Sequence, residues 1–390
     1  MMVTWNTFSD TKESMVEFGF KVENLNMTAS GSRTKFVDGG LEKHTQYIHR
    51  VTLTNLIPGS LYMYRCGSSY GWSSLFYFRA LPSDPTPKGG IRFAVYGDMG
   101  NENPQALGRL QVEAQNGMYD AILHVGDFAY DMEQGNGTVG DEFMRQIETA
   151  AAYVPYMTCP GNHENAYNFS NYKNRFTMPM YEEVESLWYS WNIGTAHIIS
   201  FSTEANFFSS QVVINNQMAW LQKDLEEATK PENRAKYPWI IAMGHKPMYC
   251  TWNTGVEDCA KIVGITREAF EDLFYKYGVD LYIGAHEHSY ERMWPLYNNK
   301  VYNGSMDAPY TNPKAPVHII TGSAGNREPQ SILLPPKSFT AFQTRDFGYT
   351  RFFILNSTHI HAEQVSDDKG GQIIDKFTLI KNQHGPEAWL

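Results

Sequence analysis

The chain has 390 residues, of which 42% are hydrophobic and 14% aromatic, so it has room for two or three domains with a large core. Its formal net charge of −10 argues against a nucleic-acid-binding protein, because such a protein needs a basic face to neutralise phosphates. No apolar run reaches the length of a membrane span. We therefore expect neither a nucleic-acid partner nor a membrane-spanning segment.

The first 82 residues are predicted to form a β-sandwich. Short stretches that alternate between apolar and polar residues recur at 1–5, 16–20, 47–53, 61–65 and 75–79, and turns rich in Gly and Pro separate them. The stretch from Leu53 to Tyr64 resembles a fibronectin type III module, and we expect the start of that module to be incomplete in this chain.

Residues 83–90, Ser-Asp-Pro-Thr-Pro-Lys-Gly-Gly, are predicted to link this unit to a second domain over 91–390. There, strands alternate with helices, which indicates an α/β domain, with two sheets packed face to face and helices outside. Asn103 and Thr266 are expected to cap two of the helices. The expected strands are 91–96, 121–125, 156–159, 239–243, 279–283 and 317–321, the expected helices are 104–117, 141–152, 216–229 and 266–278, and a C-terminal β segment is expected at about 345–385.

The four cysteines fall into two kinds. Cys250 and Cys259 lie close in sequence and would close a small loop in an oxidising compartment. Cys66 and Cys159 lie in strand-like apolar surroundings, where we expect buried free thiols.

Asn-x-Ser/Thr triplets are somewhat more frequent than chance and weakly favour a secretory route. No signal peptide is recognisable at the start of the sequence. We therefore expect a secreted or lysosomal protein whose natural start is missing from this chain. The triplets lie at Asn26, Asn136, Asn168, Asn303 and Asn356.

Polar residues able to bind metal directly follow five of the apolar strands. Because the carboxyl ends of strands in an α/β domain converge on one crevice, residues far apart in sequence are expected to meet there. The five clusters are Gly97-Asp98, Gly126-Asp127 with Tyr130, Gly161-Asn162-His163-Glu164, Gly244-His245 and His286-Glu287-His288.

Each cluster has a simpler interpretation when it is taken alone. An Asp after a strand, such as Asp98, is more often a turn former or a helix cap than a ligand. Taken together, five strand ends would each need a ligand-type residue by accident, so we favour a metal site. The other histidines keep the simpler interpretation: His124, His197 and His318 lie inside apolar strands and are predicted to be core residues.

The joint set of GDxG, GDxxY, GNHE, a later Gly-His and HxH resembles the purple acid phosphatases along nearly the whole chain. It most resembles the plant-like, high-molecular-weight form found in animals. Tyr130 separates the motif set from the wider calcineurin-like superfamily, whose serine/threonine phosphatases carry Asp-Arg-Gly after the second aspartate.

This resemblance implies a dinuclear centre. An Fe(III) ion and a divalent ion (Zn, Fe or Mn) would share Asp127 as a bridging ligand. The implied Fe(III) ligands are Asp98, Asp127, Tyr130 and His288, and the implied ligands of the divalent ion are Asp127, Asn162, His245 and His286.

The resemblance also implies an acid phosphatase that hydrolyses small phosphate monoesters or phosphoproteins by attack of a metal-bound hydroxide. His163 would donate a hydrogen bond or a proton to the leaving alkoxide, and Glu164 would orient the His163 ring. Two alternatives stay open at this point: a calcineurin-like phosphodiesterase or nucleotidase with two divalent ions, and a non-catalytic adhesion or binding protein.

Two features depart from the family pattern. Ala285 stands where many members have Gly before the HxH motif, a change small enough to keep the turn. Residues 246–253 contain none of the histidines that many plant members carry there, so the outer substrate pocket is not predicted from the resemblance. Tyr249 and Trp252 are candidates for its lining, although aromatic packing is the favoured interpretation.

Overall fold

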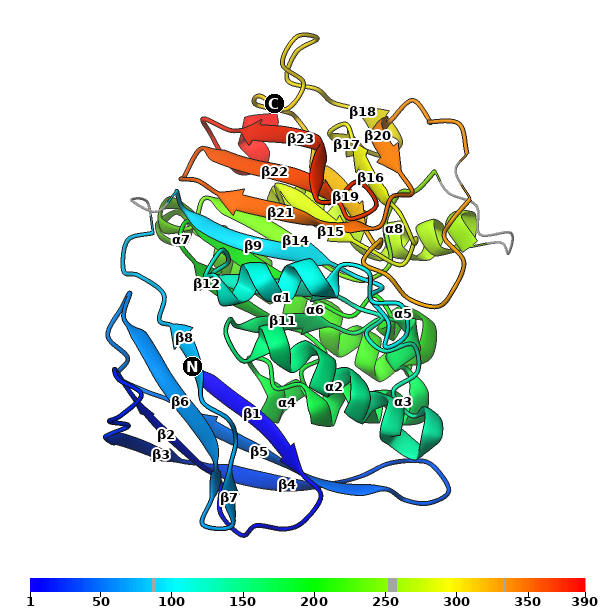
Figure 1. The fold of residues 1–390 in the computed structure, drawn as a ribbon. Helices are drawn as coiled ribbons and strands as arrows, with labels where there is room; N and C mark the ends of the chain where they lie inside the picture. The colour runs from blue at the N-terminus through cyan, green and yellow to red at the C-terminus, as the bar shows by residue number, and fades with distance from the viewer. Residues whose placement is uncertain (86–88, 252–257, 333, 390) are drawn as a thin grey trace.

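In a computed structural model of the protein, the described residues are 1–85, 89–251, 258–332 and 334–389 (Figure 1). A unit of short strands, blue in Figure 1, is followed by a larger unit of sheets and helices. Of the predicted linker 83–90, residues 86–88 lie outside the described part of the chain. Among the described residues, no helix is long and apolar enough to cross a membrane.

The first unit is a two-sheet β-sandwich, which confirms the predicted fold class. Val51 from one sheet packs with Val16, Tyr62 and Phe78 from the other in one buried cluster. Both sheets therefore contribute to a shared core. One sheet has the order β1 (Met2–Thr7), β5 (Thr45–Thr52), β4 (Ser32–Val37), and the other β3 (Met27–Ser30), β2 (Met15–Gly19), β6 (Leu61–Ser68), β7 (Gly71–Trp72), with β8 (Phe76–Arg79) also paired to β6.

The second unit contains two larger sheets that pack face to face. Phe93 and Leu123 from one sheet share a buried cluster with Ile241 and Ile283 from the other. The first sheet has the order β11 (Tyr156–Cys159), β10 (Ala121–Val125), β9 (Ile91–Tyr96), β21 (Gly348–Ile354), β22 (His359–Ser366), β23 (Gln372–Ile380). The second has the order β12 (Tyr189–Ile193), β13 (Ala196–Ser200), β14 (Trp239–Met243), β15 (Leu281–Gly284), β19 (Val317–Thr321), β16 (Tyr290–Met293), β20 (Thr340–Thr344). A small hairpin joins β17 (Leu296–Tyr297) to β18 (Lys300–Val301).

Helices pack outside the two sheets, as predicted from the alternation of strands and helices. In a second buried cluster, Leu110 and Ile147 pack with Tyr96 of β9, and Phe270 packs with Ile240 of β14. The helices are α1 (Leu107–Gln115), α2 (Thr138–Ala151), α3 (Ala166–Arg175), α4 (Tyr181–Val184), α5 (Ala205–Phe208), α6 (Gln211–Ala228), α7 (Pro231–Lys236) and α8 (Asp258–Tyr277), with the short helical turns η2 (Gln134–Gly137), η3 (Asn162–Glu164) and η4 (Pro386–Trp389).

Three predicted helix starts are wrong. Asn103 does not cap α1: its φ is 60°, its side chain donates to the carbonyl of Asn326, and the helix begins at Leu107. Thr266 lies inside α8, which begins at Asp258. Helix α6 begins five residues before the predicted start at 216, at Gln211. Thr266 and Asn216 thus lie inside longer helices, and Asn103 lies before its helix, so a residue type that often caps helices did not mark a helix start at these places.

The turn between β4 and β5 (residues 38–44) packs against the second unit. The buried Asp38 accepts a hydrogen bond from Asn171 of α3 at 3.0 Å. Behind the turn, Asp141 of α2 accepts hydrogen bonds from Gln46 at 3.1 Å and from the buried Arg175 at 2.7 Å. This contact fixes the first unit against α2 and α3, the two helices that follow the polar clusters at the ends of β10 and β11.

A candidate two-metal centre

The five polar clusters predicted from the sequence meet at one edge of the two sheets. Strands β9, β10 and β11 run parallel in the first sheet, and β14 and β15 run parallel in the second, so their carboxyl ends point the same way within each sheet. The residues that follow these strand ends are Asp98, Asp127, Asn162, His245 and His286.

Backbone strain is concentrated at these residues. Four of the predicted ligands have a left-handed backbone, with φ of 59° at Asp98, 52° at Asp127, 58° at Tyr130 and 70° at His286. A non-glycine residue in this region costs on the order of 1–3 kcal/mol, and such residues cluster at functional sites. Asp98, Asp127 and His286 are each the second residue after the end of a strand, and Tyr130 is the fifth residue after β10.

Two glycines make this close approach possible. A Cβ atom on Gly161 would lie 2.2 Å from Asp127 Oδ1. Gly126 has a φ of +81°, and a Cβ atom there would lie 2.5 Å from His245 Nδ1. The Gly-Asp and Gly-Asn motifs therefore have a steric cause, because any side chain at these positions would displace a predicted ligand.

Asp98, Tyr130 and His288 form one compact group, which we call the tyrosine group. The Tyr130 hydroxyl lies 2.7 Å from His288 Nε2 and donates to Asp98 Oδ1 at 3.0 Å. His288 Nε2 lies 3.6 Å from the same Asp98 oxygen. Burial, reinforced by Asp98, raises the pKa of Tyr130 well above its usual range, so a phenolate would need a strong positive charge beside it.

Asp127, His245 and His286 form a second group, the histidine group. His245 Nε2 lies 3.0 Å from Asp127 Oδ2 and 3.2 Å from His286 Nδ1. One ligand atom from each of the three residues lies within 4.8 Å of the others. Asp127 also contacts the segment after β11, since its Oδ1 accepts a hydrogen bond from the backbone N–H of His163 at 2.9 Å.

Backbone carbonyls orient two of the histidines. His245 Nδ1 lies 2.8 Å from the carbonyl oxygen of Val125, and His288 Nδ1 lies 3.0 Å from that of Pro329. A carbonyl only accepts hydrogen bonds, so each Nδ1 carries a proton, and Nε2 is the ring atom left to bind a metal ion. Both Nε2 atoms face carboxylates of the site, which is the arrangement expected of metal-binding histidines.

The charges of the histidine group also favour a cation. Burial raises the pKa of Asp127, but His245 and His163 outweigh burial and hold it well below its usual range. Burial opposes protonation of His245, but without a metal ion Asp127 raises the pKa of His245 to about 9, so a cation that binds between them would take the place of the proton on Nε2. Burial holds the pKa of His286 well below its usual range, and the nearby charge of Lys246 lowers it further. This ring is therefore neutral and can offer an electron pair to a metal ion. Carboxylate oxygens and neutral imidazole nitrogens this close together fit a bound divalent metal ion.

His163 lies beside the two groups, with 19% of its side chain exposed. Its Nδ1 lies 2.7 Å from Asp131 Oδ1, and its Nε2 lies 3.5 Å from Glu328 Oε1. Burial lowers the pKa of His163, but Asp127 and Asp131 outweigh it and raise that pKa to about 10. The ring is therefore held in the protonated form suited to a hydrogen-bond or proton donor.

The structure corrects the partner predicted for Glu164. Its Oε2 accepts hydrogen bonds from the backbone N–H groups of Asp127 at 2.9 Å and Gly161 at 2.8 Å, and its Oε1 accepts one from Phe128 at 2.9 Å. Glu164 is buried and ties together the backbone of two ligand loops. The carboxylate that orients the His163 ring belongs to Asp131 instead.

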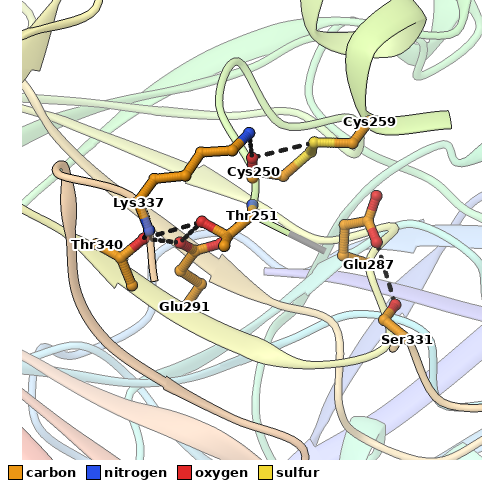
Figure 2. The surroundings of a disulfide bond; sticks show 8 residues. All are labelled: Cys250, Thr251, Cys259, Glu287, Glu291, Ser331, Lys337 and Thr340. Carbon is orange, nitrogen blue, oxygen red and sulfur yellow. Dashed lines mark hydrogen bonds between the residues drawn. A yellow bond between two sulfur atoms is a disulfide. The ribbon is translucent and has the colours of Figure 1, made fainter. Parts of the chain in front are cut away.

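The segment after His245 is packed firmly into the protein. Tyr249 is buried and its hydroxyl donates to Glu271, so the packing interpretation holds for Tyr249, whereas Trp252 lies outside the described residues. Figure 2 shows the disulfide bond between Cys250 and Cys259, with Lys337 donating to the Cys250 carbonyl at 2.9 Å.

The other cysteine and histidine predictions agree with the structure. Cys66 and Cys159 are buried free thiols. His124, His197 and His318 are all buried.

Thr251 and Thr340 in Figure 2 both donate hydrogen bonds to the buried Glu291. These contacts fix the end of the segment after His245.

Sequence reasoning missed three polar residues at the site. Asp131 follows Tyr130 directly, but it belongs to no strand end and to no motif used above. Lys246 follows His245, and its Nζ donates to Asn162 Oδ1 at 2.8 Å. Glu204, which follows β13, lies 3.1 Å from the same Nζ. For Asp131 and Lys246 a usable signal was a charged residue directly after a predicted ligand, whereas Glu204 had no such signal.

Family models match three parts of the chain. The purple acid phosphatase N-terminal domain matches residues 1–80, the calcineurin-like phosphoesterase matches 91–290, and the iron/zinc purple acid phosphatase-like protein C matches 315–376. The matches cover both units described above.

Curated relatives and a solved structure agree with these matches. The chain is 53% identical to acid phosphatase type 7 of Danio rerio over 100% of this chain and 90% of that protein. It is 52% identical to acid phosphatase type 7 of Homo sapiens, again over 100% of this chain and 90% of that protein. The structure of a purple acid phosphatase from yellow lupin (Lupinus luteus) seeds matches with a TM-score of 0.81 and 26% identity, over 97% of this chain and 72% of that chain.

Proposed function

Since the chain belongs to the purple acid phosphatase family, we propose that it hydrolyses phosphate monoesters at a dinuclear metal centre formed by the tyrosine and histidine groups. The observation that carries this proposal is the placement of Tyr130 within 3.0 Å of Asp98 and 2.7 Å of His288, beside the histidine group. A buried tyrosine among ligand-type residues distinguishes this centre from one built only of carboxylates and imidazoles.

The two groups differ in the ion that they suit. In the tyrosine group, a phenol with a strongly raised pKa would ionise only beside a strongly Lewis-acidic ion such as Fe(III). The neutral imidazoles of the histidine group suit a softer divalent ion such as Zn, Fe or Mn. We assign Asp98, Asp127, Tyr130 and His288 to Fe(III), and Asp127, Asn162, His245 and His286 to the divalent ion.

When bound, the two ions would acidify a water molecule for use as the nucleophile and neutralise charge on the phosphoryl oxygens. The chain itself supplies the proton donor for the leaving group. His163 is held by Asp131 at 2.7 Å, and 19% of its side chain is exposed. A protonated ring in this position donates to the departing alkoxide, whose charge grows in the transition state.

The main alternative is a calcineurin-like phosphodiesterase or nucleotidase with two divalent ions. Two divalent ions do not require a tyrosine ligand, yet here the Tyr130 hydroxyl lies between the Asp98 carboxylate and the His288 imidazole. The third interpretation, a non-catalytic binding protein, gives no reason for so complete a set of ligand-type side chains.

A visible absorption spectrum, with metal analysis on the same sample, tests the proposal. We expect a broad band in the green to yellow region together with iron, arising from tyrosinate bound to Fe(III). Tyr130→Phe should abolish the band, and the control Tyr156→Phe, at a tyrosine bonded to Tyr96 and His124 outside the site, should leave it unchanged. A colourless protein with two divalent ions and phosphodiesterase activity would favour the alternative.

We also infer a secretory location. A disulfide between Cys250 and Cys259 is stable in an oxidising compartment. Three of the five glycosylation triplets have an exposed asparagine, namely Asn26, Asn168 and Asn356. Secretion from a cell that expresses the full gene, followed by a mass shift on glycan removal, is the expected result.

A further inference from the structure

A buried ion pair lies directly beside the proposed divalent-ion site. Lys246 is 4% exposed and Glu204 is 0% exposed, and Lys246 Nζ lies 3.1 Å from Glu204 Oε2. The same Nζ donates to Asn162 Oδ1 at 2.8 Å and lies 5.1 Å from the centre of the Phe207 ring. A buried charge pair is costly to desolvate, so its presence at this place calls for a specific role.

The backbone around Lys246 is held as firmly as its side chain. Its N–H donates to the Thr203 hydroxyl at 2.9 Å, and its carbonyl accepts a hydrogen bond from the Tyr282 hydroxyl at 2.6 Å. Thr203 in turn donates to Glu204 Oε1 at 3.1 Å. The ammonium therefore has little freedom to leave Asn162, and the whole arrangement is fixed from two strand ends.

The contact with Lys246 decides which atom of the Asn162 amide can face a metal ion. An asparagine amide ends in one oxygen that accepts and one nitrogen that only donates, and the two ends have nearly the same shape. An ammonium only donates, so it locks the oxygen toward itself and excludes the flipped amide. The oxygen keeps a second lone pair, which leaves it able to bind a cation at the same time.

We propose that Lys246 is a positioning residue for the divalent-ion site: it holds the Asn162 amide with its oxygen available as a ligand, and Glu204 cancels the charge of the ammonium. This inference rests on the proposed function, because it assumes that Asn162 binds the divalent ion. The ammonium lies 2.8 Å from Asn162 Oδ1. Without the negative charge of Glu204 beside it, the ammonium would repel the ion that Asn162 is positioned to bind, so Glu204 is part of this proposal.

The test is a Zn²⁺ titration of protein that retains its iron and has lost its divalent ion. Lys246→Met alone would leave the carboxylate of Glu204 unpaired, so the informative variant is Lys246→Met combined with Glu204→Gln. We expect its dissociation constant for Zn²⁺ to rise about 10- to 100-fold, the usual effect of removing a partner of a metal ligand. The exposed Lys223→Met is the matched control, with an unchanged dissociation constant.

A second background keeps the test decisive if the double variant folds poorly. In Asn162→Asp, both terminal atoms are oxygens, so orientation by Lys246 is no longer needed. We expect Lys246→Met to weaken Zn²⁺ binding much less in this background than with Asn162 present. The unpaired carboxylate of Glu204 is present in both backgrounds, so its effect cancels in the double-mutant cycle that measures this coupling.

Two results would overturn the inference. The first is unchanged or tighter Zn²⁺ binding in the double variant. The second is weaker binding of inorganic phosphate with unchanged Zn²⁺ binding, which would make Lys246 a substrate-binding residue. Failure of the proposed function is seen separately, because wild-type protein would then show no iron and no visible band before any variant is compared.

Discussion

Replacing Asp131 by Asn removes the negative charge that faces His163 while keeping the size of the side chain. The Asp131 carboxylate lies 2.7 Å from His163 Nδ1, and the two side chains are 25% and 19% exposed. We expect Asp131→Asn to weaken the protonated form of the ring and to slow steps in which the leaving group needs a proton.

The magnitude follows from the contact. A hydrogen bond to a charged group contributes about 1.5–3 kcal/mol. Since 1.36 kcal/mol corresponds to a tenfold change in rate, the turnover of an alkyl phosphate should fall by roughly 10- to 150-fold. An aryl phosphate with an acidic phenol as leaving group needs little proton donation, so its turnover should fall much less.

Steady-state kinetics with one ester of each kind measure this difference directly. The comparison variant is Glu164→Gln, which places an amide donor against the backbone N–H groups that Glu164 binds. It should lower the melting temperature and slow both esters to a similar extent. The assignment of Asp131 would be refuted by an equal effect of Asp131→Asn on both esters, or by leaving-group selectivity in Glu164→Gln alone.

Three predictions concern stability. Burial opposes ionisation of Asp280, but its partners Lys381 and Arg234 hold its pKa below the usual range. The ionised Asp280 therefore stabilises the folded protein above about pH 4, and this contribution is lost as the pH falls further. Asp280→Asn should therefore lower the free energy of unfolding by about 3–5 kcal/mol at pH 7, and the deficit should shrink in denaturant titrations below about pH 4. Replacing Cys250 and Cys259, nine residues apart, by Ser should cost about 2.5 kcal/mol in the same assay, and no loss would mean that the bond is unimportant for stability. Gly39→Val should cost about 1–3 kcal/mol, because a Cβ atom there would lie 2.1 Å from the Tyr167 ring; an unchanged melting temperature would show that the contact yields freely.

The sequence predicts the centre of the fold better than its edges. The strands Trp239–Met243 and Val317–Thr321 lie where the apolar runs predict them, because a fully buried parallel strand is a continuous apolar stretch. Strands β3 and β4 were missed: β3 has only four residues, none of them buried, and in β4 only Phe36 is buried.

The ligand-type residues were predictable for the same reason. Each follows a strand that the sequence identifies, and parallel strands bring their ends together whatever lies between them. Contacts made by single turns were not predictable. Asp131 reaches His163 through a left-handed backbone, with φ of 77°, and nothing in the local pattern distinguishes Asp131 from Glu164 as the partner of that ring.

Lys246 shows the same limit across the two sheets. Its partner Asn162 is 84 residues away, and the two are joined only because β11 and β14 end at the same edge of the molecule. The sequence therefore predicts which residue types gather at the site, while the pairing of individual side chains depends on backbone turns that only the structure provides.

The first unit takes part in the same arrangement. Its turn at residues 38–44 bonds to α3 through Asp38 and Asn171, and Gly137 at the start of α2 lies against the same aspartate, with a hypothetical Cβ only 3.4 Å from its carboxylate. The loop from Tyr130 to Gly137 and the turn from Asn162 into α3 are thus both in contact with this unit. A strained ligand loop keeps its conformation only when its surroundings determine it, so the first unit helps to hold the backbone on which the proposed tyrosine ligand depends.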